Sequence, residues 1–239
     1  MLVFSIDPGT GASSPTAIAA FDPMTKQISF TRNLWTEMKG QHHVLHDLTS
    51  QMRAWYRKLR ALRKTPIMVV SETFVMRGKG GETLQRLIGA YESACPLDYW
   101  WRTVYNTAVK KHVSGNGDGD KLYVALGVKY FFMENEASKK YVEELIMDEE
   151  WDRTDALAIG IAGWIQEQYL TDDPNNPTPE MAAIKLFERA DKTLFLEAEV
   201  VAQKAREVKR QREKQQRKEH IRKGNREYAL ASAARRRKR

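Results

Sequence analysis

Four acidic residues of this 239-residue sequence have the types and spacings that metal chemistry needs. Asp7 and Glu72 each close a short apolar run, whereas Asp152 and Asp155 lie three residues apart. Hard divalent cations such as Mg²⁺ prefer carboxylate oxygens, and two such ions about 4 Å apart can activate a water and stabilise a leaving oxygen. If the four carboxylates converge, they predict hydrolysis of a phosphodiester.

Each of these carboxylates also has a purely structural interpretation. Asp7 precedes Pro8 and Gly9, an ordinary turn sequence. Asp152 and Asp155 could cap a helix or interact with its dipole, which does not exclude metal binding. The strongest functional signal comes from Glu72, because this residue ends a strand that the sequence predicts to be buried, where an unpaired charge is costly.

The elements that must position these residues begin with strands. Apolar runs and turn signals predict strands at residues 2–6, 16–21 and 27–35, joined by short connections as in an antiparallel meander. A helix with apolar residues every three or four positions over residues 45–62 then leads to a continuous apolar strand at residues 67–72. A strand that follows a helix is expected to run parallel to its neighbour.

The rest of the first 170 residues continues this alternation. A second helix should end near residue 93, before a strand at residues 99–105. Helical patterns follow at residues 122–132 and 137–147, and a last core helix at residues 153–169. The predicted fold is therefore α/β, with a mixed central sheet whose first three strands are antiparallel and whose later strands are parallel, flanked by helices.

Charge divides the chain into an acidic part and a basic part. Residues 201–239 contain 16 Lys and Arg against 4 Asp and Glu, a balance of +12, so residues 1–200 contain 23 basic and 27 acidic residues. We predict a domain at residues 1–170, a linker at 171–180 and a basic helical or disordered tail at 181–239. Such a tail favours nucleic acid as a partner over a membrane surface.

Composition also bears on the cellular compartment. No run approaches the roughly 20 apolar residues that a membrane span needs, and the first residues are typical of a strand, not of a signal peptide. The single cysteine, Cys95, rules out an internal disulfide. We expect a cytoplasmic protein with no membrane partner and no small-molecule substrate.

Four motifs, in order across residues 1–170, resemble those of the RuvC family of Holliday junction resolvases, which has the RNase H-like fold. The motifs are Ile6-Asp7-Pro8-Gly9, Val70-Ser71-Glu72, Val109-Lys110 followed by Val113-Ser114-Gly115-Asn116-Gly117 and Lys121, and Asp152-Arg153-Thr154-Asp155-Ala156-Leu157-Ala158. Each motif alone is weak, but the four in this order are specific.

The resemblance implies a homodimer that binds four-way DNA junctions and nicks two opposing strands. It implies Mg²⁺ as the cofactor, with two ions per site and Mn²⁺ as a substitute. Lys110 and Lys121 match family lysines that hold or polarise phosphate, although simple surface lysines are the alternative. The implied metal ligands and catalytic carboxylates are Asp7, Glu72, Asp152 and Asp155.

Further residues are candidates for DNA contact. An aromatic residue soon after the second acid stacks on junction bases in some family members, and Phe74 or the neighbouring Val75 occupies that place here. Basic side chains in and after a glycine-rich loop are suited to backbone phosphates, with solvated loop charges as the alternative. The predicted DNA contacts are Phe74, Arg77, Lys79, Arg86 and Lys111.

The sequence departs from the family after its last motif. Cellular members end near that helix, whereas this chain continues to residue 239 with a basic terminus. The extension indicates a phage-encoded relative and leaves flapped or other branched DNA open as substrates.

Two other interpretations remain. One is a non-catalytic DNA-binding protein on the same fold, which the four retained carboxylates disfavour. The other is an actin-like or sugar-kinase-type ATP-binding protein, because the loop from Asp7 to Gly11 also resembles the phosphate loop of those proteins. They need a second such loop in a duplicated domain, which this sequence lacks.

Overall fold

The computed structural model describes residues 1–10, 14–62, 66–73, 79–115 and 120–169. All of them belong to the first of the two units into which the chain divides, Met1–Ala190. The linker and the tail predicted from the sequence therefore lie outside the described residues.

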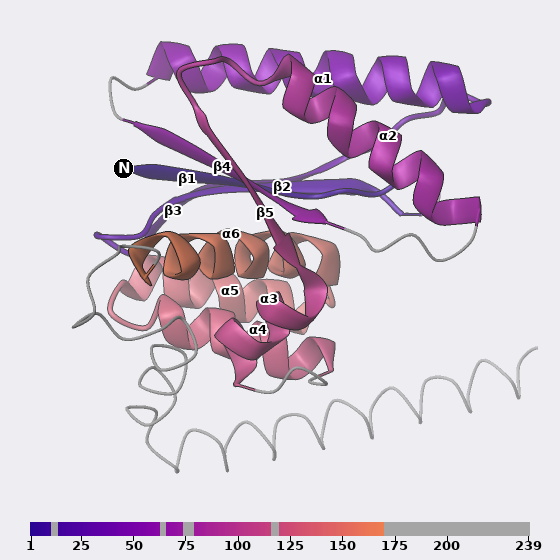
Figure 1. Ribbon diagram of the computed structural model, residues 1–239. Coiled ribbons are helices and arrows are strands. Elements are labelled where there is room, and N and C mark those ends of the chain that lie inside the picture. Colours follow the sequence, from indigo (N-terminus) through magenta and orange to yellow (C-terminus); the bar gives the residue numbers. More distant parts are fainter. Residues whose placement is uncertain (11–13, 63–65, 74–78, 116–119, 170–239) are drawn as a thin grey trace, which may run out of the picture. The chain divides into compact units, whose positions relative to one another are not determined.

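Five strands and six helices make up this part of the chain (Figure 1). In chain order they are β1 (Leu2–Asp7), β2 (Thr16–Asp22), β3 (Gln27–Leu34), α1 (Gln41–Leu62), β4 (Ile67–Thr73), α2 (Lys79–Ala94), β5 (Trp100–Tyr105), α3 (Asn106–Ser114), α4 (Lys121–Phe131), α5 (Glu136–Met147) and α6 (Trp151–Tyr169).

The strands form one mixed sheet in the order β3-β2-β1-β4-β5. β2 pairs antiparallel with β1 and β3, whereas β4 pairs parallel with β1 and β5, which confirms the predicted arrangement. The register pairs Ile6 with Ser71, so the next residues, Asp7 and Glu72, stand side by side where their parallel strands end. The sheet alone thus brings two of the four acids together.

Helices cover both faces of the sheet (Figure 1). α1 and α2 pack on one face, where Leu48, Met52 and Tyr56 of α1 are buried against Phe4 of β1. The helices α3 to α6 pack on the other face. Strand side chains alternate between the faces, and Asp7 and Glu72 fall on the α6 side because they are in phase with Val3 and Val70 of that core. None of the helices in the described part of the chain is long and apolar enough to cross a bilayer.

α6 lies very close to the sheet. A Cβ atom at Gly160 would be 2.8 Å from Ser5 Oγ on β1, and one at Gly163 would be 2.4 Å from a methyl carbon of Val70 on β4. Glycine at both positions therefore lets the helix backbone rest directly on the two central strands. The start of α6 is thereby fixed relative to the ends of β1 and β4.

Replacing Gly163 with alanine is expected to lower the free energy of unfolding by about 1–2 kcal/mol. Overpacking typically costs about 1–3 kcal/mol, which outweighs the gain in helix propensity of up to about 1 kcal/mol. Gly89 is the matched control, because it is also helical and a Cβ there meets nothing within 4 Å. Gly89→Ala should stabilise the protein by about 0.5–1 kcal/mol. Urea denaturation measures both, and effects of the same sign would contradict the packing argument.

Candidate metal centre

Three carboxylates meet where β1 ends and α6 begins. One carboxylate oxygen from each of Asp7, Asp152 and Asp155 lies within 4.8 Å of the others. Oxygens at such distances can share a hard divalent cation, whose ligands lie about 2.0–2.6 Å from the ion. Two acids come from one helix because positions three apart share a helix face.

α6 begins earlier than the sequence pattern predicted. Its first residue is Trp151, and the backbone N–H of Thr154 donates to the carbonyl of Glu150 at 3.2 Å. Asp152 is therefore a helical residue of the first turn and not the residue that caps the helix. An acid in this turn faces the positive end of the helix dipole, a contact that stabilises the helix.

Glu72 is the fourth carboxylate of the site. Only 5% of its surface is exposed, and it lines the same cavity, of about 180 Å³, as Asp7 and Asp155. The amide of Asn106 hydrogen-bonds its carboxylate, but Oε1 has no hydrogen-bond partner among the described residues. A buried carboxylate oxygen without a partner is costly, and a bound cation would supply one. The residues present therefore fit a divalent metal.

Two ammonium groups reach this cavity from neighbouring helices. Lys121, the first residue of α4, places its Nζ 3.2 Å from a carboxylate oxygen of Asp155 and 3.9 Å from one of Asp152. Lys110 of α3 lines the cavity as well. The site therefore holds four carboxylates and two lysines, and its charge stays negative when all are ionised.

This excess of negative charge shows in the protonation of Asp7. Burial raises the pKa of its carboxyl well above the ordinary value, and the charges of Asp155, Glu72 and Asp152 raise it further. Burial disfavours the charged form of any carboxyl, and the neighbouring carboxylates disfavour one more negative charge among them. A divalent cation would reverse both effects by supplying the opposite charge.

The other groups of the site follow the same balance. Burial raises the pKa of Glu72, opposed by the hydrogen bond from Asn106. Burial also raises the pKa of Asp155, opposed by Lys121. Burial of Lys121 disfavours its charge, but Asp155 and the other carboxylates outweigh it, so the pKa of this lysine is raised. Lys121 is therefore an ammonium group held by the acid cluster.

The structure thus brings together six residues that the sequence singled out. Other predicted residues lie elsewhere. Arg86 is exposed on α2 and pairs with Glu82 one turn away, and Lys111 is exposed on α3 outside the lining of the cavity. Lys79 was expected in a loop but is the first residue of α2, because that helix begins within the glycine-rich stretch. Phe74, Val75 and Arg77 lie outside the described residues.

The sequence interpretation missed Asn106. This residue begins α3 directly after β5, and Tyr105 pairs with Thr73 of the parallel strand β4. Because the ends of parallel neighbours meet at one edge of a sheet, a polar residue just after β5 belongs beside Glu72. That signal was present, but Asn106 stands outside every acidic or basic motif.

The strand order, the mixed pairing and the close packing of α6 on β1 and β4 are those of an RNase H-like fold. The chain is similar to T. thermophilus RuvC in complex with Holliday junction substrate, with 18% identity and a TM-score of 0.51 over 72% of this chain and 97% of that chain. The predicted α/β fold class is thereby confirmed.

Other comparisons add less. The Thermus thermophilus RuvC structure matches with 18% identity and a TM-score of 0.48, over 68% of this chain and 92% of that one. ROK hexokinase from Thermus thermophilus matches with 18% identity and a TM-score of 0.30, over 51% of this chain and 40% of that chain. No protein-family model and no curated protein matches the sequence.

Proposed function

We propose that this chain is a metal-dependent DNA endonuclease that hydrolyses phosphodiesters in branched DNA, four-way junctions included. The observation that carries the proposal is the convergence of the carboxylates: Asp7, Glu72 and Asp155 line one cavity, and an oxygen of Asp152 lies within 4.8 Å of oxygens of Asp7 and Asp155. The buried Oε1 of Glu72 has no hydrogen-bond partner among the described residues. We infer two Mg²⁺ ions per site, which Mn²⁺ can replace. The residues that would hold them are Asp7, Glu72, Asp152 and Asp155.

When bound, divalent ions would lower the pKa of a water and stabilise the leaving oxygen. The chain's own groups do the rest. Lys110 and Lys121 bring two positive charges to the cavity, where they can bind phosphate oxygens. Asn106 holds the Glu72 carboxylate by one hydrogen bond. Apolar side chains on the walls, from Val109, Val124 and Ile159, limit the entry of bulk water.

The substrate is inferred from fold and charge together. One solved relative in fold is in complex with a Holliday junction, and two sites in a homodimer would nick two opposing strands. The charge of +12 in residues 201–239 supports affinity for any DNA, which should fall steeply with salt. Contacts from outside the cavity would come from Phe74, Arg77, Lys79, Arg86 and Lys111. We place the protein in the cytoplasm of a bacterial or phage-infected cell.

Cleavage of end-labelled four-way junction, flap and linear duplex by the full chain in Mg²⁺ tests this function. We expect paired nicks in the junction, made at least about 10-fold faster than any cut in the duplex. Equal cutting of all three substrates would remove the junction selectivity and leave the nuclease. Tight junction binding with no cutting in Mg²⁺ or Mn²⁺ would instead support the non-catalytic interpretation.

Neighbouring lysines on α3 separate a role at the cavity from general attraction to DNA. Lys110→Met is expected to slow junction cleavage about 10- to 30-fold, because it removes a positive charge that can bind the scissile phosphate. Lys111→Met removes the same charge outside the lining of the cavity and should change the cleavage rate by less than about 3-fold. Single-turnover kinetics at saturating enzyme measure both rates. Equal losses would contradict a specific role for Lys110 at the cavity.

A further inference from the structure

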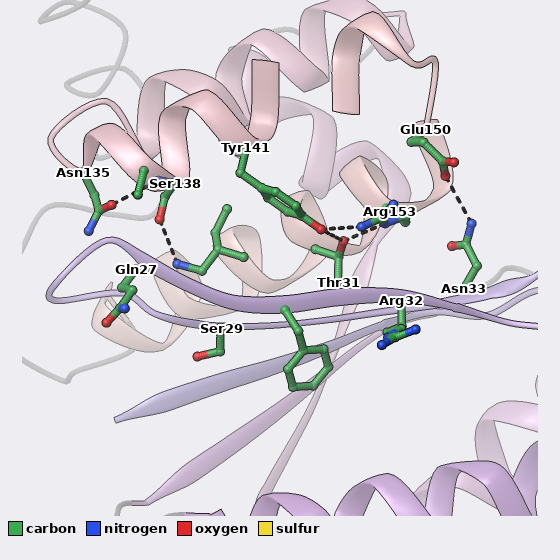
Figure 2. A pocket seen from close by; sticks show the side chains of 13 residues that line it. Gln27, Ser29, Thr31, Arg32, Asn33, Asn135, Ser138, Tyr141, Glu150 and Arg153 are labelled. Carbon is green, nitrogen blue, oxygen red and sulfur yellow. Dashed lines mark hydrogen bonds between the residues drawn. The ribbon is translucent and has the colours of Figure 1, made fainter. Parts of the chain in front are cut away.

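The first turn of α6 is tied to the edge strand β3 by a cluster of three polar side chains. Arg153 Nε donates to Thr31 Oγ1 at 2.7 Å, and the Nη2 of the same guanidinium donates to the hydroxyl of Tyr141 on α5. The two hydroxyls hydrogen-bond each other at 2.7 Å. Figure 2 shows these contacts closing a triangle, which we name the Thr31–Tyr141–Arg153 cluster.

This cluster holds the helix turn that carries two of the proposed metal ligands. Arg153 lies between Asp152 and Asp155 in sequence, and successive helical residues are about 100° apart. Its side chain therefore leaves the helix toward β3 while Asp155 faces the cavity. Fixing Arg153 on the edge strand fixes the rotation of the turn, and with it the direction of both aspartates.

The same strand holds the residue before this turn. The amide of Asn33 donates to Glu150 at 3.4 Å, and Glu150 supplies the carbonyl that accepts the first helical hydrogen bond of α6 (Figure 2). Thr31 and Asn33 are two apart on β3 and so point to the same side. β3 thus contacts the start of α6 at two successive positions of one face.

The Arg153 guanidinium holds the helix turn by the geometry of its hydrogen bonds and not by an ion pair. In the part of the chain that the structure describes, no carboxylate lies within 4 Å of Arg153, so its bonded partners are two neutral hydroxyls. A planar guanidinium that donates through two nitrogens is held in one orientation, which a lysine ammonium would not be. Its effect on the aspartates therefore passes through the helix backbone.

The cluster lines an open cleft of about 740 Å³ beside β3 and α5 (Figure 2). Water in this cleft can reach the groups that a substitution leaves without a partner, so single replacements need not unfold the chain. The charged side chains that line it, Arg32, Arg153 and Glu150, have mixed signs. The cleft therefore does not indicate a charged ligand. Its access to water allows the residues of the cluster to be replaced one at a time.

We propose that Arg153 is a positioning residue for the metal centre, held by Thr31 and Tyr141 so that Asp152 and Asp155 face the ion. The inference rests on the metal centre of the proposed function. Groups that orient metal ligands from outside commonly contribute 10- to 100-fold to metal affinity. Removing the cluster should therefore weaken metal binding while the four carboxylates remain in place.

Thr31→Val and Tyr141→Phe test this role, since each removes one hydroxyl and little volume. We expect each variant of the full chain to bind Mn²⁺ about 10-fold more weakly, measured from the free-ion EPR signal, and to need about 10-fold more Mg²⁺ for half-maximal cleavage. At saturating Mg²⁺ the rate should return to within about 3-fold of wild type. A purely structural role would lower the melting temperature without moving the metal titration.

Thr49→Val is the matched control. Thr49 is also buried and lies on α1, across the sheet, and its hydroxyl has no hydrogen-bond partner among the described residues. This variant should bind Mn²⁺ like the wild type. Arg153→Lys keeps the charge but loses the two-nitrogen geometry, so it should weaken Mn²⁺ binding as Thr31→Val does.

Three outcomes would overturn the inference. The first is that Thr31→Val and Tyr141→Phe bind Mn²⁺ as tightly as Thr49→Val does. The second is that Arg153→Lys binds Mn²⁺ with the affinity of the wild type. The third is that the wild type itself binds no Mn²⁺. If Thr31→Val does not fold, Tyr141→Phe decides, because Tyr141 is only half-buried. A wild type that binds Mn²⁺ but cuts no DNA would overturn the proposed nuclease and leave this comparison valid.

Discussion

In Mg²⁺, the Asp7→Asn variant is expected to cleave a four-way junction about 10³-fold more slowly than the wild type. Asp7 is one of three residues whose carboxylate oxygens lie within 4.8 Å of one another, and an amide is a poorer ligand because it carries no charge. Losing a ligand that stabilises the transition state through the metal removes several kcal/mol. About 4 kcal/mol corresponds to this factor.

Single-turnover cleavage of labelled junction measures the effect, with junction binding followed in parallel. Asp98→Asn is the control, because Asp98 is exposed and its nearest ion pair is with Arg60 at 3.9 Å. It should cut like the wild type. Asp7→Asn should still bind the junction, since a carboxylate repels phosphate. An unchanged cleavage rate in Asp7→Asn would contradict a mechanism in which Asp7 holds the metal.

Without divalent metal, the wild type is expected to unfold at a higher temperature at pH 5.5 than at pH 7.5. Burial raises the folded-state pKa of Asp7, Glu72 and Asp155 above the unfolded values. Between its two pKa values each group binds more protons when folded, so stability falls as pH rises through that window. This dependence is opposite to that of a carboxylate in an ordinary salt bridge.

Calorimetry in a chelator at both pH values measures the difference. When the folded and unfolded pKa of a group differ by one, the free energy of unfolding changes by about 1.4 kcal/mol across the window. Each kcal/mol corresponds to about 2–4 °C for a domain of this size, so the melting temperature should be measurably lower at pH 7.5. Asp7→Asn should be more stable than the wild type at pH 7.5 and less dependent on pH. Each Mg²⁺ ion that binds, at 100 times its Kd, should add about 2.7 kcal/mol to the stability of the wild type at pH 7.5. A wild type that is less stable at pH 5.5 than at pH 7.5, by the same margin as Asp7→Asn, would contradict the inferred effect of burial and neighbouring charge on these carboxyl groups.

The sheet could be predicted from the sequence because its signals are local. Apolar runs of strand length, turn residues between them and one intervening helix decided the pairing directions, which the structure confirms. Asp7 and Glu72 could be placed together for the same reason, since adjacent parallel strands end at one edge. The approach of Asp152 and Asp155 to these strand ends depends on small residues of α6, and Gly160 and Gly163 are the ones that permit it.

The remaining features depend on contacts that no sequence pattern carries. Thr31 and Arg153 are 122 positions apart, and neither residue type nor spacing marks them as partners. Arg86 was grouped with the loop before α2 by proximity in sequence, yet its partner Glu82 lies one helical turn away. The start of α6 was predicted two residues too late, so Asp152 could not be assigned to the helix and its direction could not be derived from the 100° between successive helical residues.

The two glycines of α6 also limit how this helix could change in length. Inserting one residue between Asp155 and Gly160 would turn everything after it by about 100° and advance it by about 1.5 Å. The acids could then face the cavity only if side chains replaced glycine against β1 and β4, where a Cβ has no room. An insertion of seven residues restores the phase but separates the two regions by about 10 Å. We therefore expect homologous chains to vary in length before Trp151 or after Trp164, and to keep the interval between the acids and the glycines constant.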